Sequence, residues 1–123
     1  MLAQLSPTEA YRRVDFDARV EGASQEELIL VCFEQFVSAL GTAIHAADIA
    51  DNALKSRSLT RALSAVTALQ LGVSEDGGVA QALRQVYEGA RRTILDSALQ
   101  FDGARLKALR EDFREIGQAL RDA

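Results

Sequence analysis

Apolar residues recur at helical spacing through most of the chain. They predict one long helix from about 24 to 47, a second over 53–73 and a third over 79–101. A fourth begins after 102, and its apolar positions are alternately three and four residues apart, which is typical of a seam facing the interior of a bundle: Leu106, Leu109, Phe113, Ile116 and Leu120. The pattern therefore predicts four long amphipathic helices.

Polar residues and glycines that favour helix ends separate these four segments. Ser24-Gln25-Glu26-Glu27 has the spacing of a capping box, and Asp102 is a predicted N-cap. Asp51-Asn52 and Gly77-Gly78 interrupt the helical pattern. Because these connections are short, neighbouring helices should run antiparallel. We therefore expect an all-α fold, an antiparallel up-down four-helix bundle that residues 24–123 form as a single domain.

Residues 1–23, called the N-terminal segment below, have a different pattern. Ser6-Pro7-Thr8-Glu9 predicts the start of a short helix, and Gly22 interrupts the chain before the bundle. The sizeable apolar side chains between residues 8 and 23 are few: Tyr11, Val14, Phe16 and Val20. We expect this segment to be a short cap or helix that lies against the bundle.

Residues 28–33 are all apolar. Successive residues of a helix point about 100° apart, so these side chains cannot all face the interior of one bundle. The outward ones need a cover, and the N-terminal segment is the nearest candidate. Burial among neighbouring helices and a dimer interface are the alternatives.

Residues 62–74 contain no charged residue, although a solvated helix face usually carries Lys or Glu. We expect Ser64, Ala65, Ala68 and Leu71 to point outward. Small, uncharged side chains there would let a partner helix approach closely. A weakly polar face exposed to solvent is the alternative.

Composition and charge exclude several classes of function. The chain has 123 residues and a net charge of −4, without the basic patch that nucleic-acid binding requires. No apolar run approaches the roughly 20 residues of a membrane span, and no signal peptide is apparent. A single cysteine excludes an internal disulfide and fits a reducing cytosol. We therefore expect a soluble, cytoplasmic protein with no nucleic-acid or membrane partner.

Catalytic chemistry is not indicated by the sequence. His45 and Cys32 are its only histidine and cysteine, too few for a zinc or di-iron site. Gly77-Gly78 is not followed by the Lys and Ser or Thr of a phosphate-binding loop. A histidine phosphotransfer bundle is an alternative, but Asp48 stands where a phosphate-binding Lys is wanted. We expect no enzyme activity, no cofactor and no metal site.

Three stretches, in this order along the chain, resemble the FliS family of flagellin export chaperones. The family pattern V-x-T-A-S-P-x-x-L-I-x is similar to Val20-Glu21-Gly22-Ala23-Ser24-Gln25-Glu26-Glu27-Leu28-Ile29-Leu30. The pattern G-G-x-x-A-x-x-L is similar to Gly77-Gly78 with Ala80 and Leu83. The pattern L-Y-D-Y-I-x-R-R-L is similar to Val86-Tyr87-Glu88 with Arg92 and Ile94.

Several residues depart from these patterns. Gly22 and Gln25 stand where the family has Thr and Pro, and Gly89 replaces an aromatic residue. Cys32-Phe33-Glu34-Gln35 replaces the family's L-Y-D-G and keeps the aromatic residue and the acid. The chain therefore looks like a divergent branch.

The resemblance implies a cytoplasmic chaperone that binds the C-terminal segment of flagellin. That segment is disordered in the monomer and helical in the filament, so binding would prevent premature polymerisation. The subunit would then stay ready for the flagellar type III export gate, whose components are further expected partners. In the family, the N-terminal segment caps a hydrophobic site and moves aside when flagellin arrives, and residues 28–33 are where we expect such a site.

The residues expected to contact the partner come from the N-terminal segment and from the first and third long helices: Tyr11, Phe16, Val20, Ile29, Phe33, Leu83, Tyr87, Arg91 and Ile94. Either Tyr11 or Phe16 would be the aromatic residue of the cap. For Tyr87 we weigh two roles, lining a partner groove or packing in the core. The alternative function is a non-catalytic helical bundle or adaptor that associates with itself, and a homodimer is compatible with either function.

Overall fold

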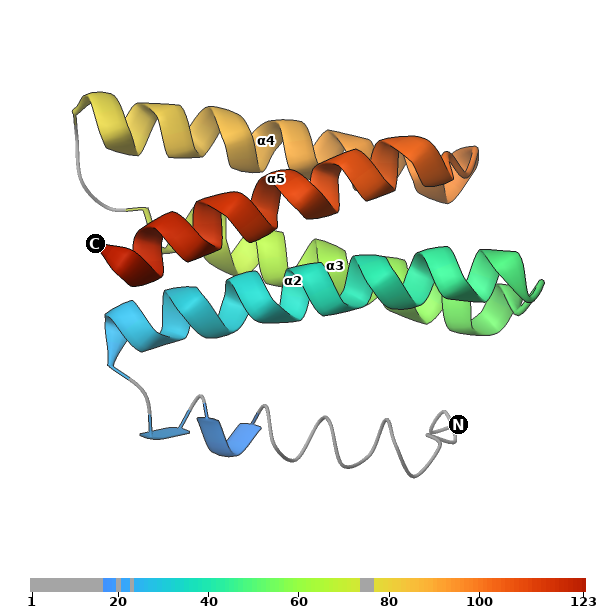
Figure 1. Ribbon diagram of the computed structural model, residues 1–123, viewed down its shortest axis with the longest axis horizontal. Coiled ribbons are helices and arrows are strands. Elements are labelled where there is room, and N and C mark those ends of the chain that lie inside the picture. Colours follow the sequence, from blue (N-terminus) through green and yellow to red (C-terminus); the bar gives the residue numbers. More distant parts are fainter. Residues whose placement is uncertain (1–16, 20, 23, 74–76) are drawn as a thin grey trace.

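The computed structural model describes residues 17–19, 21–22, 24–73 and 77–123, and these residues form helices and short connections (Figure 1). The long helices are α2 (Gln25–Asp48), α3 (Asn52–Leu71), α4 (Gly78–Leu99) and α5 (Gly103–Asp122). Residues 17–19 and 21–22 are also helical, and no strand occurs in the described part of the chain. The all-α prediction is confirmed, and the predicted helix ends lie within about two residues of the observed ones.

Side-chain caps start three of the long helices, and the caps at Ser24 and Asp102 are those that the sequence predicted. The Ser24 hydroxyl oxygen accepts a hydrogen bond from the backbone N–H of Glu27 at 3.2 Å. The Asp51 carboxylate caps α3, and the Asp102 carboxylate accepts from the N–H of Arg105 at 3.1 Å at the start of α5. α4 has no side-chain cap and begins instead after Gly77, whose φ of 131° is accessible to glycine but strained for other residues.

The helices form an antiparallel bundle in which consecutive helices run in opposite directions (Figure 1). α2 packs against both α3 and α5, and α3 packs against α4. The backbones of α4 and α5 approach each other least among the packed pairs. Each helix has two neighbours in the bundle, and α2 is the central element because it takes part in the two most closely packed pairs.

Its central position also accounts for the composition of α2. The helix is long and apolar enough to cross a membrane by composition alone, with a mean hydropathy of 1.6 in its most apolar window. However, Phe33, Phe36 and Leu40 lie in the core of the bundle, where apolar side chains are required.

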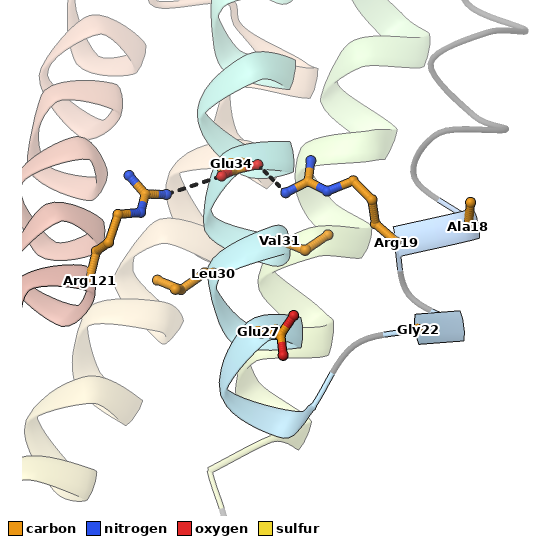
Figure 2. A pocket seen from close by; sticks show the side chains of 8 residues that line it. All are labelled: Ala18, Arg19, Gly22, Glu27, Leu30, Val31, Glu34 and Arg121. Atoms are coloured by element: carbon orange, nitrogen blue, oxygen red, sulfur yellow. Dashed lines mark hydrogen bonds and ion pairs between the residues drawn. The ribbon is translucent and has the colours of Figure 1, made fainter.

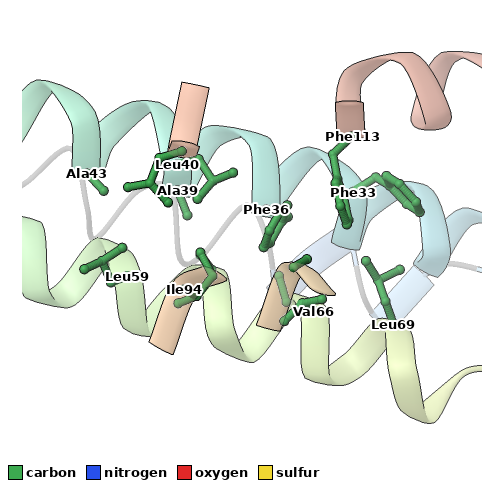
Figure 3. Close-up of a cluster of buried hydrophobic side chains, with 14 of the residues drawn as sticks. Phe33, Phe36, Ala39, Leu40, Ala43, Leu59, Val66, Leu69, Ile94 and Phe113 are labelled. Carbon is green, nitrogen blue, oxygen red and sulfur yellow. The ribbon is translucent and has the colours of Figure 1, made fainter. Parts of the chain in front are cut away.

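Four aromatic rings form the centre of the core. Phe113 of α5 lies 4.4 Å from Phe36 and 5.3 Å from Phe33 between ring centroids, both on α2. Tyr87 of α4 lies 6.2 Å from the Phe113 ring and packs edge-on to Phe33 at 6.1 Å. Aliphatic residues of α2 and α3 extend this core along the bundle (Figure 3).

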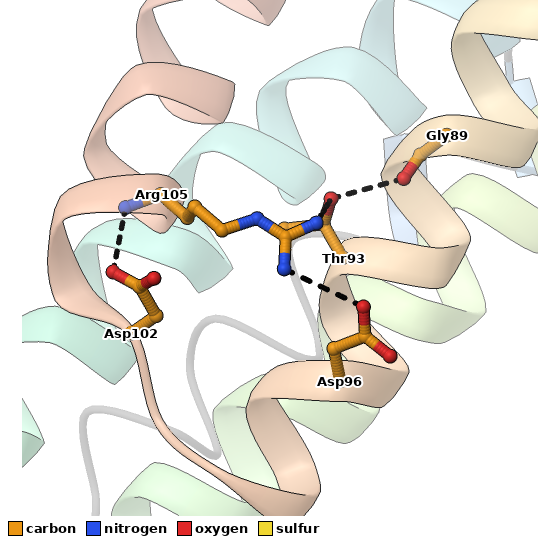
Figure 4. Close-up of polar contacts among 5 residues, drawn as sticks. All are labelled: Gly89, Thr93, Asp96, Asp102 and Arg105. Carbon is orange, nitrogen blue, oxygen red and sulfur yellow. Dashed lines mark hydrogen bonds and ion pairs between the residues drawn. The ribbon is translucent and has the colours of Figure 1, made fainter.

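A polar cluster joins the end of α4 to the start of α5, where these helices come together (Figure 4). The Arg105 guanidinium donates to the Thr93 hydroxyl oxygen at 3.1 Å and pairs with the Asp96 carboxylate at 3.4 Å. The Thr93 hydroxyl in turn donates to the Gly89 carbonyl at 3.0 Å. These contacts connect two helices whose backbones pack only sparsely.

The uncharged stretch on α3 is only partly as expected. Ser64, Ala68 and Leu71 are exposed, and the Leu71 side chain is 82% exposed. The expectation for Ala65 was wrong, because Ala65 is 6% exposed and belongs to the core cluster. It stands three residues after Ala62 and four before Leu69, both buried in the core, and this spacing places it on the inward face of the helix.

The turn between α2 and α3 contains a residue with a left-handed backbone. Ala50 has a φ of 57°, a region that costs a residue with a Cβ about 1–2 kcal/mol. The N–H of Asp51 donates to the Ala46 carbonyl at 2.8 Å and that of Ala50 to the Ala47 carbonyl at 3.2 Å. This is the hydrogen-bond pattern of a Schellman motif, in which glycine is preferred at the left-handed position.

We predict that Ala50→Gly stabilises the bundle by about 1 kcal/mol, because glycine adopts this conformation without strain. The melting temperature followed by circular dichroism should rise by about 4 °C. The control is Ala108→Gly, the same change at an exposed position inside α5, which should lower stability by about 0.5–1 kcal/mol. Equal destabilisation by both variants would contradict the prediction.

Candidate functional site

The first turns of α2 lie between two segments that are distant in sequence. Residues 18–19 and 22 are on one side and the end of α5 is on the other (Figure 2). Between them is an open pocket of about 370 Å³, called the α2 pocket below, lined by Ala18, Arg19, Gly22, Glu27, Leu30, Val31, Glu34 and Arg121. The α2 residues of its wall share one face because they are three to four residues apart.

Glu34 is the polar centre of the α2 pocket. Its Oε2 atom pairs with Nη2 of Arg19 at 2.6 Å, and its Oε1 atom pairs with Nη2 of Arg121 at 3.0 Å. The Arg19, Glu34 and Arg121 side chains are each close to half exposed. One carboxylate thus connects α2 to the chain before it and to the end of α5, through ion pairs that are weak individually because water reaches them.

The apolar wall of the α2 pocket explains why residues 28–33 can be apolar on more than one side of the helix. Ile29, Cys32 and Phe33 pack toward the bundle core, whereas Leu30 and Val31 line the pocket. Val31 is only 5% exposed although it does not belong to the core cluster. The apolar run therefore serves two surfaces of the helix, the core and the pocket.

The sequence that forms this bundle has a counterpart among known families. The chain matches the family model described as flagellar protein FliS over residues 7–123. The chain belongs to the FliS family. A search of curated proteins finds no match. Membership implies a chaperone role in flagellar export, and the family is one of soluble cytoplasmic chaperones that are not known as enzymes.

The structure places three of the predicted contact residues of this FliS-family chain in the core. Phe33, Tyr87 and Ile94 are each 2% exposed and hold the helices together. Of the two roles weighed for Tyr87, its burial supports packing in the core. In this conformation none of the three offers a partner an accessible side chain.

The other predicted contact residues fall into two groups. Ile29, Leu83 and Arg91 are partly buried, and the two apolar ones pack against the core cluster with part of their surface accessible. Their contact with a partner stays a prediction. The remaining three lie outside the residues that the structure describes: Tyr11, Phe16 and Val20.

Sequence reasoning missed the two ion pairs of the α2 pocket, in which Glu34 meets Arg19 and Arg121. A signal was present, because residues 21–53 contain no Lys or Arg that could pair with an acid on α2. A cation for Glu34 had to come from another segment. Which segment supplies it depends on the tertiary arrangement and cannot be read from local spacing.

Other surfaces of the FliS-family chain are apolar and exposed at the two ends of the bundle. Leu71 and Val79 are 82% and 76% exposed at the end where α3 stops and α4 begins. Ile49 and Leu99 are exposed at the opposite end. His45 is exposed in the last turn of α2, and no cluster of metal-ligating side chains occurs among the described residues.

The buried Tyr87 phenol has an unusual pKa. Burial, with a smaller contribution from nearby Cys32, raises this pKa from 10.0 to about 12. Burial also raises the pKa of the Cys32 thiol. Both groups are therefore neutral at physiological pH, which agrees with a packing role.

We predict that the Tyr87 phenol ionises near pH 12 in the folded protein. The unfolded chain ionises first, so stability present below pH 10 should be lost progressively as the pH rises to about 12. Tyrosinate absorbance of a Tyr11→Phe variant reports Tyr87 alone, since the sequence has two tyrosines. A Tyr87→Phe variant is the control, and ionisation near pH 10 with the helical signal intact would refute the prediction.

Proposed function

We propose that this chain is a cytoplasmic export chaperone that binds the C-terminal segment of flagellin. In this role it keeps flagellin from polymerising early and supports type III flagellar secretion. The match to the FliS family over residues 7–123 is the strongest support. The α2 pocket adds support, because it provides an apolar surface beside residues 17–19 and 21–22, which precede the bundle.

A flagellin segment that folds on binding loses conformational entropy and needs a large apolar contact in return. Contacts of this kind bury about 2,000 Å² or more. A pocket of about 370 Å³ is too small to supply this alone. The α2 pocket is therefore proposed as one anchor point of a longer contact surface.

Further apolar side chains lie at the same end of the bundle as the α2 pocket. α2 and α4 begin at this end, while α3 and α5 stop there (Figure 1). Ile29 and Leu83 are partly accessible in these first turns, and Leu71 and Val79 are strongly exposed. We propose that the flagellin segment follows this end of the bundle and then extends along it.

The N-terminal segment is proposed to compete with flagellin for the α2 wall of the pocket, because it forms the opposite wall and its Arg19 reaches across to Glu34. Its described part is tied to α2 by the Arg19–Glu34 pair, which is close to half exposed. Pairs of this kind stabilise by about 0–1 kcal/mol, so displacement costs little. A competing segment lowers the apparent affinity by the fraction of time that it occupies the site.

We predict that a peptide of the flagellin C-terminal segment binds the full chain and gains helix on binding. Isothermal titration calorimetry measures the heat, and circular dichroism of the mixture measures the added helix. A scrambled peptide of the same composition is the control. No heat and no added helix at high micromolar concentration would contradict the proposal.

The alternative, a bundle that associates with itself, has a separate signature. It predicts a mass that rises with protein concentration in analytical ultracentrifugation without any peptide. The exposed Ile49 and Leu99 are the side chains that such association would bury. Self-association without peptide binding would support this alternative instead.

We predict that Arg19→Ala leaves the affinity for the flagellin peptide equal or raises it up to about fivefold, because the competing segment is held less firmly. Deleting residues 1–18 should likewise leave the bundle folded, make it more prone to aggregate and keep or raise the affinity. Lys107→Ala, which removes an exposed cation from α5, is the control and should change nothing. Lost binding in the deletion variant would show that the segment is itself a contact surface.

A further inference from the structure

The two oxygens of Glu34 have different partners. Arg121 pairs with Oε1 and Arg19 with Oε2, so each guanidinium uses one oxygen only. Arg19 belongs to the segment that the proposed function displaces, whereas Arg121 belongs to the bundle itself. Displacement therefore leaves Oε1 paired and Oε2 without its donor.

The surroundings of Glu34 offer no replacement for Arg19 from its own helix. α2 carries no Lys or Arg, and Glu27 is a second acid in the same pocket wall. Among the residues lining the α2 pocket, Glu27 and Glu34 then face the single cation Arg121. The pocket becomes net negative when Arg19 leaves.

A partner that covers this pocket removes water from the Glu34 carboxylate. An acceptor that loses water without gaining a donor destabilises the complex, and the penalty is larger when the acceptor is charged. Leu30 and Val31 form the apolar wall beside it. A well-matched partner therefore needs a cation placed next to apolar side chains.

We propose that Arg19 occupies the place of a basic side chain of the bound segment, and that Glu34 determines specificity for that side chain. This rests on the proposed function, and it adds the chemistry of the residue that is recognised: a Lys or Arg flanked by apolar residues that pack on Leu30 and Val31. Because Arg121 already donates to Oε1, a two-pronged pair with a second guanidinium is disfavoured, and Arg gains little over Lys. The site accepts Lys and Arg alike.

The two roles of Glu34, holding Arg19 alone or also pairing with the peptide, predict different peptide affinities when Glu34→Gln is added to Arg19→Ala. If Glu34 only holds Arg19, neutralising it frees the pocket, and Arg19→Ala/Glu34→Gln binds the flagellin peptide as tightly as Arg19→Ala. If Glu34 pairs with the peptide, the double variant binds about threefold or more weakly than Arg19→Ala. Its affinity should also depend less on salt. Glu115→Gln, the same change at an exposed site on α5, is the matched control.

The peptide gives an independent measurement that needs no change to Glu34. Each Lys or Arg of the flagellin peptide is replaced singly by norleucine, and binding is measured with Arg19→Ala and with the double variant. One replacement should weaken binding to Arg19→Ala by about threefold or more and have little effect on the double variant, which is the coupling of a direct pair. Arg and Lys at that peptide position should bind equally well.

Two results would overturn the inference while leaving the proposed function in place. The first is equal affinity of Arg19→Ala and the double variant, with both melting within a few degrees of the unaltered chain. The second is a peptide in which no basic position couples to Glu34. Failure of both the unaltered chain and Arg19→Ala to bind the peptide would instead remove the proposed function itself.

Discussion

The packing of Phe113 against three other aromatic rings is the contact on which the arrangement of the bundle depends. α2 and α4 lie diagonally, and their backbones do not pack together. Phe113 reaches Phe33 and Phe36 on one side and Tyr87 on the other, so one side chain of α5 connects both helices. Aromatic pairs contribute about 0.5–1.5 kcal/mol beyond the area they bury, and the three ring pairs that Phe113 makes align α5 with α2 and α4 along the bundle.

The face of α5 that carries Phe113 continues to the α2 pocket, so the alignment of α5 with α2 also positions the charged residues there. Gly117 follows Phe113 by one turn, and a Cβ at this glycine would lie 3.4 Å from the Phe33 ring, so α5 approaches α2 closely here. Arg121 follows by one more turn and meets Glu34, the neighbour of Phe33 in sequence. Core packing and the charged site are thus successive turns of one helix–helix contact, and a change in the core would move the Arg121 guanidinium relative to its carboxylate.

The parts of this structure that the sequence predicts are those decided by neighbouring residues. Caps at Ser24 and Asp102, the break at Gly77 and the α5 seam as far as Ile116 each follow from residues within a few positions of one another. The prediction that Leu120 also faces the interior was wrong, because this side chain is exposed in the last turns of α5. The Glu34 pairs join residues 15 and 87 positions apart, for which spacing carries no signal. Motif position likewise did not reveal whether Phe33, Tyr87 and Ile94 face the core or a partner, because a resemblance aligns residues without orienting their side chains.

The place of Arg121 in the chain has a practical consequence for laboratory work. Arg121 lies in the last turn of α5, so a purification tag or fluorescent protein joined directly after this helix would begin beside the guanidinium that holds Glu34. An oligohistidine tail would bring additional imidazoles close to the carboxylates of Glu27 and Glu34 and change the charge of the α2 pocket at mildly acidic pH. Removing such an extension, or attaching the protein to a surface or label through an exposed side chain in the middle of α5, leaves the electrostatics around Glu34 unchanged.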